Sequence, residues 1–481
     1  MDPGAWSGKV FTGEWRSTGN TAKSVEPATG DVLAEVGMAT AEDLSTSARA
    51  AADAGREWAA RPYQERTDVL RRAAQLLEDN RQPVGEWIAR EAGKVAAARS
   101  LELQLSIDEL WQAAALTAAP LGALLPSTDP DRQSIARRHP HGVVAVIAPW
   151  DFPLNLAMRS VAPALACGNA VVLKPASETV VCCGVVIARL FEQAGLPAGV
   201  LHMLPGKGSE LGTAFADDPN IDMISFTGST EVGKSLSEAA GRNVKKFVAE
   251  LGGNNPFLIL DDVDVSAAAQ AAAFGCFTHQ GQICMATGRV LVAESIAEQF
   301  VGELASAADA LSVGNPLDDV DLGPIINDSQ ATHIDEIVRR SLDAGAQLRA
   351  GGTRDGLFFR PTVIAGVSPQ MAAYTEEIFG PVAAVTTFKA DEEAISLAND
   401  TPYGLVAGVH SGSVQRAKGV GEQLRAGMVH INDQTVNDEV VAPFGGQGDS
   451  GGDGRFGAFT NLDEFTTWKW VTIRETQSTP Q

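Results

Sequence analysis

A chain of 481 residues is too long for one ordinary hydrophobic core, so we expect two or three domains. Hydrophobic residues make up 44% of the chain and charged residues 20%, which indicates a globular protein rather than a disordered or fibrous one. The net charge of -23 argues against nucleic-acid binding, which needs a basic surface, and against docking on anionic membranes.

Five cysteines and seven histidines are spread along the chain without a recurring CxxC pair. That pattern argues against a zinc cluster or a disulfide framework, so we expect no metal. The N-terminal residues lack the charged and apolar regions of a signal peptide, and no run of about 18 apolar residues could span a membrane. The sequence therefore predicts a cytoplasmic protein that binds a small molecule, with neither a nucleic-acid nor a membrane partner.

The first third of the chain is predicted to be mostly helical. One helix begins at Thr40, a residue typical of N-caps, carries acids in its first turn and keeps helical apolar spacing until Pro62. A second helix is predicted over 63–79, because its apolar residues lie on one face. The polar, turn-rich segment 127–142 is predicted to be an arm or a linker rather than core.

After that segment, short β-rich runs alternate with helical ones. The predicted strands are 143–148, 170–174, 199–204, 222–227 and 245–250. The segments between them that are long enough for crossover helices are 153–167, 178–195, 208–217 and 230–240. This alternation predicts parallel βαβ units in a doubly wound sheet, and it restarts near residue 256 as a second α/β domain would.

Several loops at strand ends carry groups that could bind a ligand. Segment 225–234, SFTGSTEVGK, ends a strand and starts a helix whose free N–H groups could hold a phosphate, although a plain capped turn explains it equally well. Lys174 could reach ribose hydroxyls or simply extend from a sheet edge. Glu377 and Phe379 could support a nucleotide or form an ordinary Gly-Pro turn. The glycine-dense segment 443–457 is either a closely packed loop or a flexible one.

Cys284 lies in the stretch HQGQICMATGR. A free cysteine is usually a small buried residue, but it can be a nucleophile where a base and backbone room are close. Gly281 and Gly288 are expected to leave that room. Glu250 ends a strand before two glycines, a place that suits a general base. Because one helix separates Glu250 from Cys284, both should lie at the same end of the sheets.

Six motifs, PWDFP, KPASE, FTGSTEVG, ELGG, GQIC and EEIFGPV, occur in the order and spacing of the aldehyde dehydrogenase superfamily. The chain resembles that superfamily from about residue 10 to residue 475, and segments 153–175 and 430–446 are similar to its benzaldehyde and vanillin dehydrogenase branch. The resemblance implies an α/β fold with a doubly wound parallel-sheet cofactor domain, a second α/β catalytic domain and a small β oligomerisation arm. It also implies a homodimer or homotetramer that oxidises an aldehyde with NAD or NADP.

Carried over position by position, the resemblance implies that Cys284 is the nucleophile and Glu250 the general base. The thiolate would attack the aldehyde, hydride would pass to the nicotinamide, and water activated by Glu250 would hydrolyse the thioester. The residues implied to bind the cofactor are Trp150, Lys174, Ser177, Gly206, Gly228, Ser229, Gly233, Glu377 and Phe379. The implied domains are 1–121 with 141–252 for dinucleotide binding, 253–449 for catalysis, and 122–140 with 464–481 for the arm.

Two positions depart from the family pattern. Asp151 stands where the family has an asparagine that donates to the oxyanion, and an ionised Asp can only accept hydrogen bonds. Asp151 would therefore either impair the site or donate as a protonated acid. Ser177 stands where many NAD-preferring members carry an acid, so a 2′-phosphate would not be repelled and use of NADP is permitted.

The resemblance favours an aromatic aldehyde. The residues expected around the substrate tunnel are Phe152, Asn155, Arg159, Phe277 and Phe444. Alternatively, Asn155 and Arg159 could form a buried structural pair, or Arg159 could grip a carboxylate as in succinic semialdehyde dehydrogenases. An alternative from another class of function is a catalytically weak binding or structural relative of these enzymes.

Overall fold

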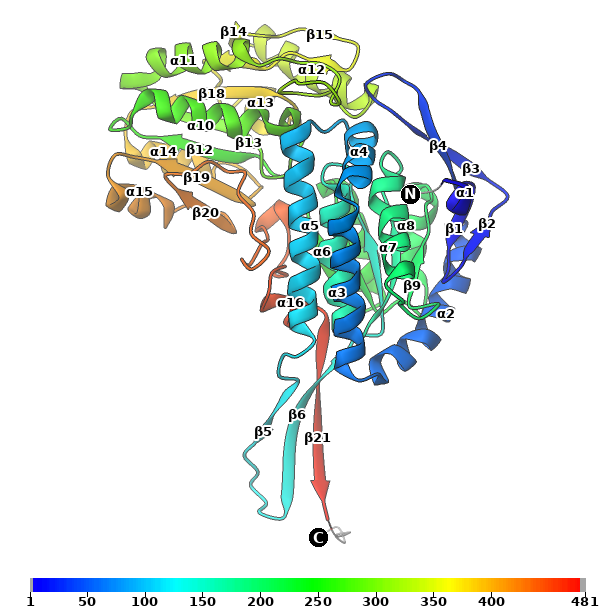
Figure 1. Ribbon diagram of the computed structural model, residues 1–481. Coiled ribbons are helices and arrows are strands. Elements are labelled where there is room, and N and C mark those ends of the chain that lie inside the picture. The colour runs from blue at the N-terminus through cyan, green and yellow to red at the C-terminus, as the bar shows by residue number, and fades with distance from the viewer. Residues whose placement is uncertain (1–2, 476–481) are drawn as a thin grey trace.

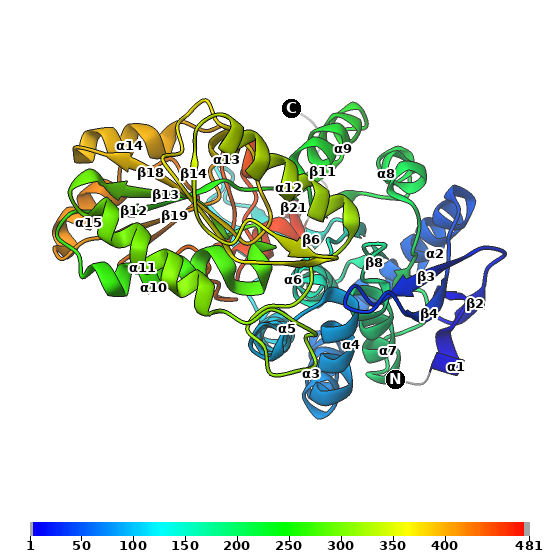
Figure 2. The ribbon, with the colours of Figure 1, turned by 90° about the horizontal axis from the view of Figure 1, so that it is seen from above.

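The computed structural model describes residues 3–475, and its two large sheets form two lobes that lie side by side (Figures 1 and 2). The first sheet has seven strands in the order β11-β10-β7-β8-β9-β1-β2. Its parallel strands are β7 (Val143–Ile147), β8 (Ala170–Lys174), β9 (Leu201–Met203), β10 (Met223–Thr227) and β11 (Lys246–Glu250). All five predicted strands are therefore confirmed, with ends that differ by at most two residues. Strand β1 (Lys9–Phe11) pairs antiparallel with β9, and the edge strand β2 (Trp15–Ser17) pairs antiparallel with β1.

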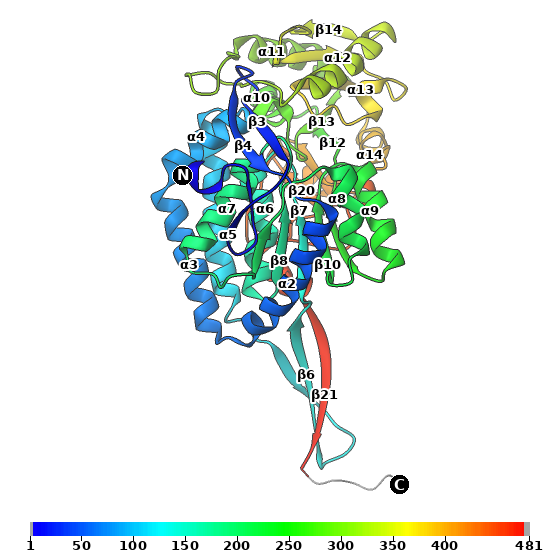
Figure 3. The same cartoon turned by 90° about the vertical axis from the view of Figure 1, so that its right-hand side faces the viewer.

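Helices cover both faces of the first sheet (Figure 3). Its crossover helices are α6 (Pro153–Ala166), α7 (Val186–Gln193), α8 (Gly208–Asp217) and α9 (Thr230–Arg242), with a π-helical turn at Val181–Val185 before α7. Because both faces are covered, the strands read as nearly continuous runs of buried apolar residues. This arrangement confirms the predicted α/β fold and its doubly wound sheet.

Four N-terminal helices pack around this sheet. They are α2 (Ala41–Ala60), α3 (Tyr63–Asp79), α4 (Arg81–Ala92) and α5 (Ala96–Leu116). The start of α2 follows from local chemistry, because Thr40 accepts from the backbone N–H of Asp43 while the Asp43 carboxylate accepts from that of Thr40. No helix within residues 3–475 is long and apolar enough to cross a lipid bilayer.

The second sheet also has seven strands, in the order β14-β17-β18-β13-β12-β19-β20. They are β12 (Asn255–Ile259), β13 (Thr287–Ala293), β14 (Gln347–Ala350), β17 (Thr362–Ala365), β18 (Val382–Phe388), β19 (Val406–His410) and β20 (Met428–Ile431). All neighbouring pairs are parallel except β14 with β17. The covering helices are α10 (Val265–Phe277), α11 (Ala297–Ala310), α12 (Asp328–Asp343), α14 (Asp391–Asn399) and α15 (Val414–Gly421). The predicted second α/β unit is thus present.

A small sheet of three strands projects from the first lobe, away from the second (Figures 1 and 3). Its strands are β5 (Gly122–Leu125), β6 (Arg132–Pro140) and β21 (Thr466–Arg474). Strand β21 pairs with β6 over nine residues, so the end of the chain returns to the segment predicted as an arm. Residues 476–481, included in the predicted arm, lie outside the described residues.

Shorter elements complete the fold. They are α1 (Pro3–Trp6), the hairpins β3 (Thr21–Val25) with β4 (Val32–Gly37) and β15 (Arg354–Asp355) with β16 (Phe358–Phe359), α13 (Ala372–Thr375) and α16 (Thr460–Glu464).

Candidate active site

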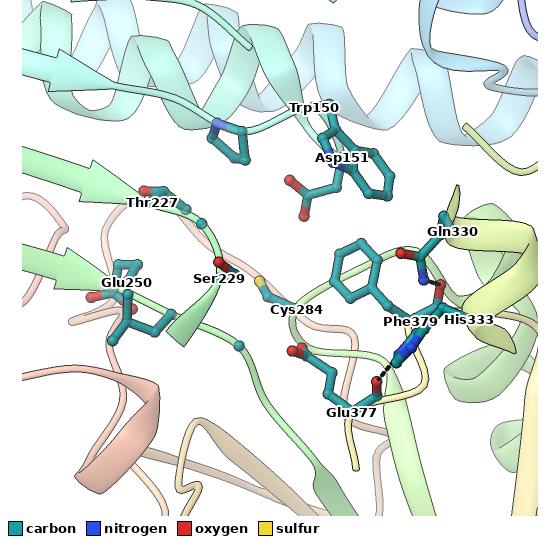
Figure 4. Close-up of a pocket in the computed structure, with 14 residues that line it drawn as sticks. Trp150, Asp151, Thr227, Ser229, Glu250, Cys284, Gln330, His333, Glu377 and Phe379 are labelled. Atoms are coloured by element: carbon teal, nitrogen blue, oxygen red, sulfur yellow. Dashed lines mark hydrogen bonds between the residues drawn. The ribbon is translucent and has the colours of Figure 1, made fainter. Parts of the chain in front are cut away.

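Two cavities meet at Cys284 and Asp151, which line both of them. The first, of about 710 Å³, lies at the carboxyl ends of β7, β10 and β11, and we call it the strand-end cavity. Its lining is Pro149, Trp150, Asp151, Thr227, Gly228, Ser229, Glu250, Leu251, Gly252, Cys284, Gln330, His333, Glu377 and Phe379 (Figure 4). Carboxyl ends of parallel strands are where open α/β sheets bind their ligands.

The second cavity, of about 750 Å³, has mostly apolar walls, and we call it the apolar cavity. It is lined by Leu101, Leu105, Asp151, Phe152, Asn155, Leu156, Arg159, Phe274, Ile283, Cys284, Met285, Gln434, Val436, Asn437, Asp438 and Phe444. A ligand in either cavity therefore reaches the same thiol.

The backbone around Cys284 is fixed by the amide of Asn255. Its Nδ2 donates to the carbonyl oxygens of Cys284 at 2.8 Å and Ala286 at 2.7 Å, and its Oδ1 accepts from the N–H of Val406 at 3.3 Å. Asn255 lies at the start of β12, five residues after Glu250. The nucleophile loop is thus tied to the segment that carries the acid.

The expectation that Gly281 and Gly288 leave room around Cys284 is wrong. Gly281 has φ +64°, and a Cβ there would lie 2.2 Å from the carbonyl oxygen of Gly380. A Cβ on Gly288 would lie 2.4 Å from Oδ1 of Asn254. Both glycines let backbone segments pack closely, so they shape the loop rather than make space for a ligand.

Glu250 ends β11 with a buried side chain, and neither carboxylate oxygen has a hydrogen-bond partner within residues 3–475. Burial raises the pKa of Glu250 well above its usual value, and the positive charge of Arg159 opposes the shift only in part. Its carboxylate lies well to one side of the Cys284 sulfur in Figure 4. A carboxyl with a raised pKa and no fixed partner suits proton transfer to and from water.

The glycine-dense segment 443–457 is a packed loop. Gly451 forms an isolated β-bridge with Glu250, and the hydroxyl of Ser450 donates to the carbonyl oxygen of Gly252 at 2.6 Å. A Cβ on Gly454 would lie 2.7 Å from the Val248 side chain. The loop therefore covers the end of β11 and holds the backbone of Glu250 in place.

Asp151 is buried between the two cavities. Burial raises its pKa to about 6, and the ammonium of Lys94 acts in the opposite direction. Lys94 is itself buried, pairs with Glu102 at 2.7 Å and lies 3.2 Å from the ring centroid of Phe152. Burial also raises the pKa of Cys284, and the carboxyls of Asp151 and Glu250 raise it further.

Glu377 and Phe379 form one wall of the strand-end cavity. Oε1 of Glu377 accepts from the N–H of Gly253 at 2.8 Å, and a Cβ on Gly252 would lie 2.1 Å from Oε2. Burial raises the pKa of Glu377 to about 7. Phe379 has φ +50° and meets the ring of Trp150 edge-on at 5.2 Å.

The start of α9 forms the opposite wall, through Gly228 and Ser229. Ser229 is the N-cap residue, and its side chain makes no capping hydrogen bond, so the first N–H groups of α9 lack that partner. Gly233 does not line the cavity. A Cβ at this position would lie 2.3 Å from the Leu251 side chain, so the glycine lets α9 pack closely against Leu251.

Three other predicted cofactor residues lie away from the lining of the strand-end cavity. Lys174 ends β8, and its Nζ donates to the carbonyl oxygen of Pro175 at 3.2 Å. Ser177 is exposed and lines a different cavity near the start of α12. Gly206 is buried, and a Cβ there would lie 2.2 Å from Leu211.

The structure brings four of the five predicted substrate residues to the apolar cavity, and Phe277 is the exception. Phe277 is 1% exposed and packs in the core of the second lobe. Phe274, one turn earlier on α10, lines the cavity instead. Sequence reasoning also missed Leu101 and Leu105, which α5 contributes.

Arg159 is held between two carboxyls. Its Nε lies 3.1 Å from Oε1 of Glu109, its Nη2 pairs with Asp438, and its guanidinium lies 4.4 Å from the ring centroid of Phe444. The predicted structural pair of Arg159 with Asn155 is not formed by hydrogen bonding within the described chain. Its partners are acids that no sequence motif indicated, since Glu109 lies on a different helix.

No group of three or more His, Cys, Asp and Glu side chains among residues 3–475 is arranged to hold a metal ion.

Comparison with known proteins identifies the relatives of this chain. Residues 15–471 match the model of the aldehyde dehydrogenase family. A vanillin dehydrogenase of Amycolatopsis sp. (strain ATCC 39116 / 75iv2) is 50% identical over 98% of each chain, and an NAD(+) benzaldehyde dehydrogenase of Pseudomonas putida is 46% identical over 98% of this chain and 97% of its own. The crystal structure of betaine aldehyde dehydrogenase from Staphylococcus aureus with NAD+ superposes with a TM-score of 0.95 at 32% identity, covering 98% of this chain and 96% of that one.

The charge of Asp151 should control the reactivity of Cys284. Asp151→Asn removes a neighbouring negative charge that disfavours the thiolate, so the midpoint of the pH dependence of Cys284 alkylation should fall by about one unit. Iodoacetamide labelling across pH, read at the Cys284 peptide by mass spectrometry, measures this midpoint. Asp453→Asn, at an exposed acid outside both cavities, is the control. An unchanged midpoint in Asp151→Asn would contradict the assignment.

Proposed function

The chain belongs to the aldehyde dehydrogenase family, and from that premise we propose that it oxidises an aromatic aldehyde to the carboxylic acid through Cys284. It is an oxidoreductase acting on aldehydes with NAD or NADP. The observation that carries the site assignment is the meeting of two cavities at one thiol, with the buried carboxyl of Glu250 lining one of the same cavities. Such a thiol can be approached by an aldehyde from one side and by a cofactor from the other.

In the first step, the deprotonated thiol of Cys284 attacks the aldehyde carbon, a C–S bond forms and the carbonyl oxygen becomes negative. The backbone N–H of Cys284 can donate to that oxygen. Asp151 can donate a second hydrogen bond only while its carboxyl is protonated, and its pKa of about 6 makes this form minor in neutral solution. We therefore infer that Asp151 weakens the first step above that pH.

When bound, the nicotinamide cofactor supplies the acceptor for the hydride that leaves the aldehyde carbon. The fit of such a group to the strand-end cavity is supported by the uncapped start of α9, which lines the cavity through Ser229. Trp150, Ser229 and Phe379 complete the lining, and Lys174, Ser177 and Gly206 remain predicted contacts outside it. The neutral, exposed Ser177 remains our reason to expect that NADP is accepted.

In the last step, Glu250 takes a proton from water, whose oxygen attacks the thioester carbon of Cys284. The C–S bond breaks, the thiolate is regenerated and the acid leaves. The raised pKa of Glu250 makes it a stronger base for this transfer than an exposed carboxylate.

An aromatic substrate is supported by the apolar cavity, whose walls include Phe152, Leu156 and Phe444 beside Cys284. It is also supported by the names of the two relatives given above, a vanillin and a benzaldehyde dehydrogenase. An anionic substrate such as a semialdehyde acid is disfavoured, because the two carboxyls beside Arg159 already compensate its charge. A catalytically weak relative is disfavoured because Cys284 and Glu250 are both present.

We further propose that the three-stranded sheet is an oligomerisation arm for a homodimer or homotetramer. Leu124 on β5 is 79% exposed and Trp470 on β21 is 70% exposed, and apolar side chains on a projecting sheet favour association.

A reaction that depends on a free thiol fits a reducing compartment, which supports a cytoplasmic location.

Cys284→Ala should abolish aldehyde oxidation because it removes the covalent nucleophile. The test follows the absorbance of reduced cofactor with benzaldehyde, vanillin, succinic semialdehyde and acetaldehyde. Wild type should prefer the aromatic aldehydes, and Cys167→Ala, at another half-buried thiol, should keep wild-type rates. Appreciable turnover by folded Cys284→Ala, or a clear preference for the aliphatic aldehydes, would overturn the proposal.

Glu250→Gln should slow hydrolysis of the thioester and spare its formation. Rapid mixing should show a burst of reduced cofactor near one equivalent per site, followed by turnover reduced about 100-fold or more. Because the reaction needs unprotonated Glu250, wild-type turnover should fall as pH drops through its raised pKa, and the variant should lack this limb. Glu422→Gln, at an exposed acid, is the control. Loss of the burst itself would move Glu250 to an earlier step.

Leu124→Glu should weaken association, because it places a charge on the exposed face of the arm without touching either cavity. Sedimentation velocity should show a homo-oligomer for wild type and a smaller species for the variant. Val414→Glu, which changes an exposed residue of α15 away from the arm, should sediment as wild type. An unchanged mass for Leu124→Glu would show that this face of the arm is not part of the interface between subunits.

A further inference from the structure

Asn155 is a buried polar side chain without a partner. It is 1% exposed and lies on α6, where it lines the apolar cavity. Within residues 3–475 its side-chain amide makes no hydrogen bond, and its Oδ1 is buried. Buried polar groups in folded proteins almost always have a hydrogen-bond partner, supplied by the protein, by water or by a ligand. The amide of Asn155 therefore indicates a partner that enters the cavity.

The other amides of the apolar cavity are already engaged. Gln434 donates from Nε2 to the carbonyl oxygen of Val436 at 2.9 Å and accepts at Oε1 from the N–H of the same residue. Asn437 donates from Nδ2 to Oδ2 of Asp433 at 3.3 Å. Arg159 pairs with Glu109 and Asp438, although its Nη1 is buried without a partner within the described residues. Asn155 is thus the amide of this cavity whose side chain makes no hydrogen bond within residues 3–475.

Asn155 shares the apolar cavity with the reacting centre. Asp151 lies two residues before α6, whereas Asn155 and Arg159 lie on α6 four residues apart, and all three line this cavity. Cys284 lines the same cavity. An aromatic ring whose aldehyde carbon lies at Cys284 therefore occupies the cavity that the amide of Asn155 faces.

We propose that Asn155 is a specificity-determining residue that binds a hydroxyl group at the meta or para position of the substrate ring. The assignment rests on the proposed oxidation of an aromatic aldehyde at Cys284. An amide offers both a donor and an acceptor, and a phenolic hydroxyl is complementary to both. A ring carboxylate would meet both the acid Asp438 and the guanidinium of Arg159, whose Nη1 makes no hydrogen bond within residues 3–475, so a 4-carboxy derivative tests whether the site binds an anion instead.

Preference for the hydroxyl follows from desolvation. A ring that carries a methyl group in place of the hydroxyl fills the same space but leaves the buried amide unpaired, so it should be oxidised less efficiently. Replacing Asn155 by leucine removes the unpaired group and the hydrogen bond together. The variant should then lose the preference without losing the ability to oxidise an aromatic aldehyde.

The test compares kcat/KM for benzaldehyde and its 4-hydroxy, 3-hydroxy, 4-methyl and 4-carboxy derivatives. Wild type should favour 4-hydroxybenzaldehyde or 3-hydroxybenzaldehyde over 4-methylbenzaldehyde by about tenfold, the usual size of one neutral hydrogen bond. Asn155→Leu should reduce that ratio to about one while its rate with benzaldehyde changes little. Gln299→Leu, which changes an exposed amide outside both cavities, should keep the wild-type ratio.

Three outcomes would overturn the assignment. Equal losses with every aldehyde in Asn155→Leu would mean that Asn155 acts on the reacting carbonyl or on the fold. A wild-type ratio near one would mean that no ring hydroxyl is recognised, and a preference for the 4-carboxy derivative would assign the site to an anion. If Asn155→Leu fails to fold, the equilibrium affinities of Cys284→Ala for the hydroxy and methyl compounds still test the preference for a ring hydroxyl. Failure of the proposed function is separate, because wild type would then not oxidise benzaldehyde either.

Discussion

The active-site arrangement depends on the three hydrogen bonds of one buried amide, that of Asn255. Cys284 lies on a loop of the second lobe, whereas Glu250 ends a strand of the first, and only a short glycine-containing segment joins that strand to β12. By donating to the carbonyl oxygens of Cys284 and Ala286, Asn255 adds a second, non-covalent tie between the loop that carries Cys284 and the segment that follows Glu250. The cavities on either side take their shape from that tie, because the same loop forms a wall of each.

The fold could be predicted because it depends on local patterns, whereas the assignment of Cys284 and Glu250 to one site rested on the resemblance of six motifs to a known family. Strands buried on both faces produce uninterrupted apolar runs, and catalytic groups at strand ends follow once those runs are located. The apolar cavity could not be predicted in the same way. Helix α10 is rich in alanine and apolar around most of its circumference, so its sequence does not show that Phe274 rather than Phe277 faces the cavity. The partners Glu109 and Asp438 come from segments 50 and 279 residues away from Arg159, and such pairings have no local signature.

Electrostatics distinguishes this site from the family pattern on which its prediction rested. Asp151, Glu250 and Glu377 surround one thiol, and burial raises the pKa of each carboxyl because the cavities offer few compensating charges. Lys94 is the cation that most opposes the shift of Asp151, and it is shared with Glu102. The charge of Asp151 also raises the pKa of Glu377, and the charges of all three carboxyls raise the pKa of the Cys284 thiol.

The return of the chain terminus has a consequence for biosynthesis. Segment 443–457 covers the strand that carries Glu250, and β21 pairs with β6, although both partners are made hundreds of residues earlier. During translation the first lobe can collapse around its own helices, but its catalytic edge stays uncovered until the last part of the chain has left the ribosome. Until β21 has been made, β6 keeps one edge unpaired, and an unpaired strand edge is prone to pair with another chain.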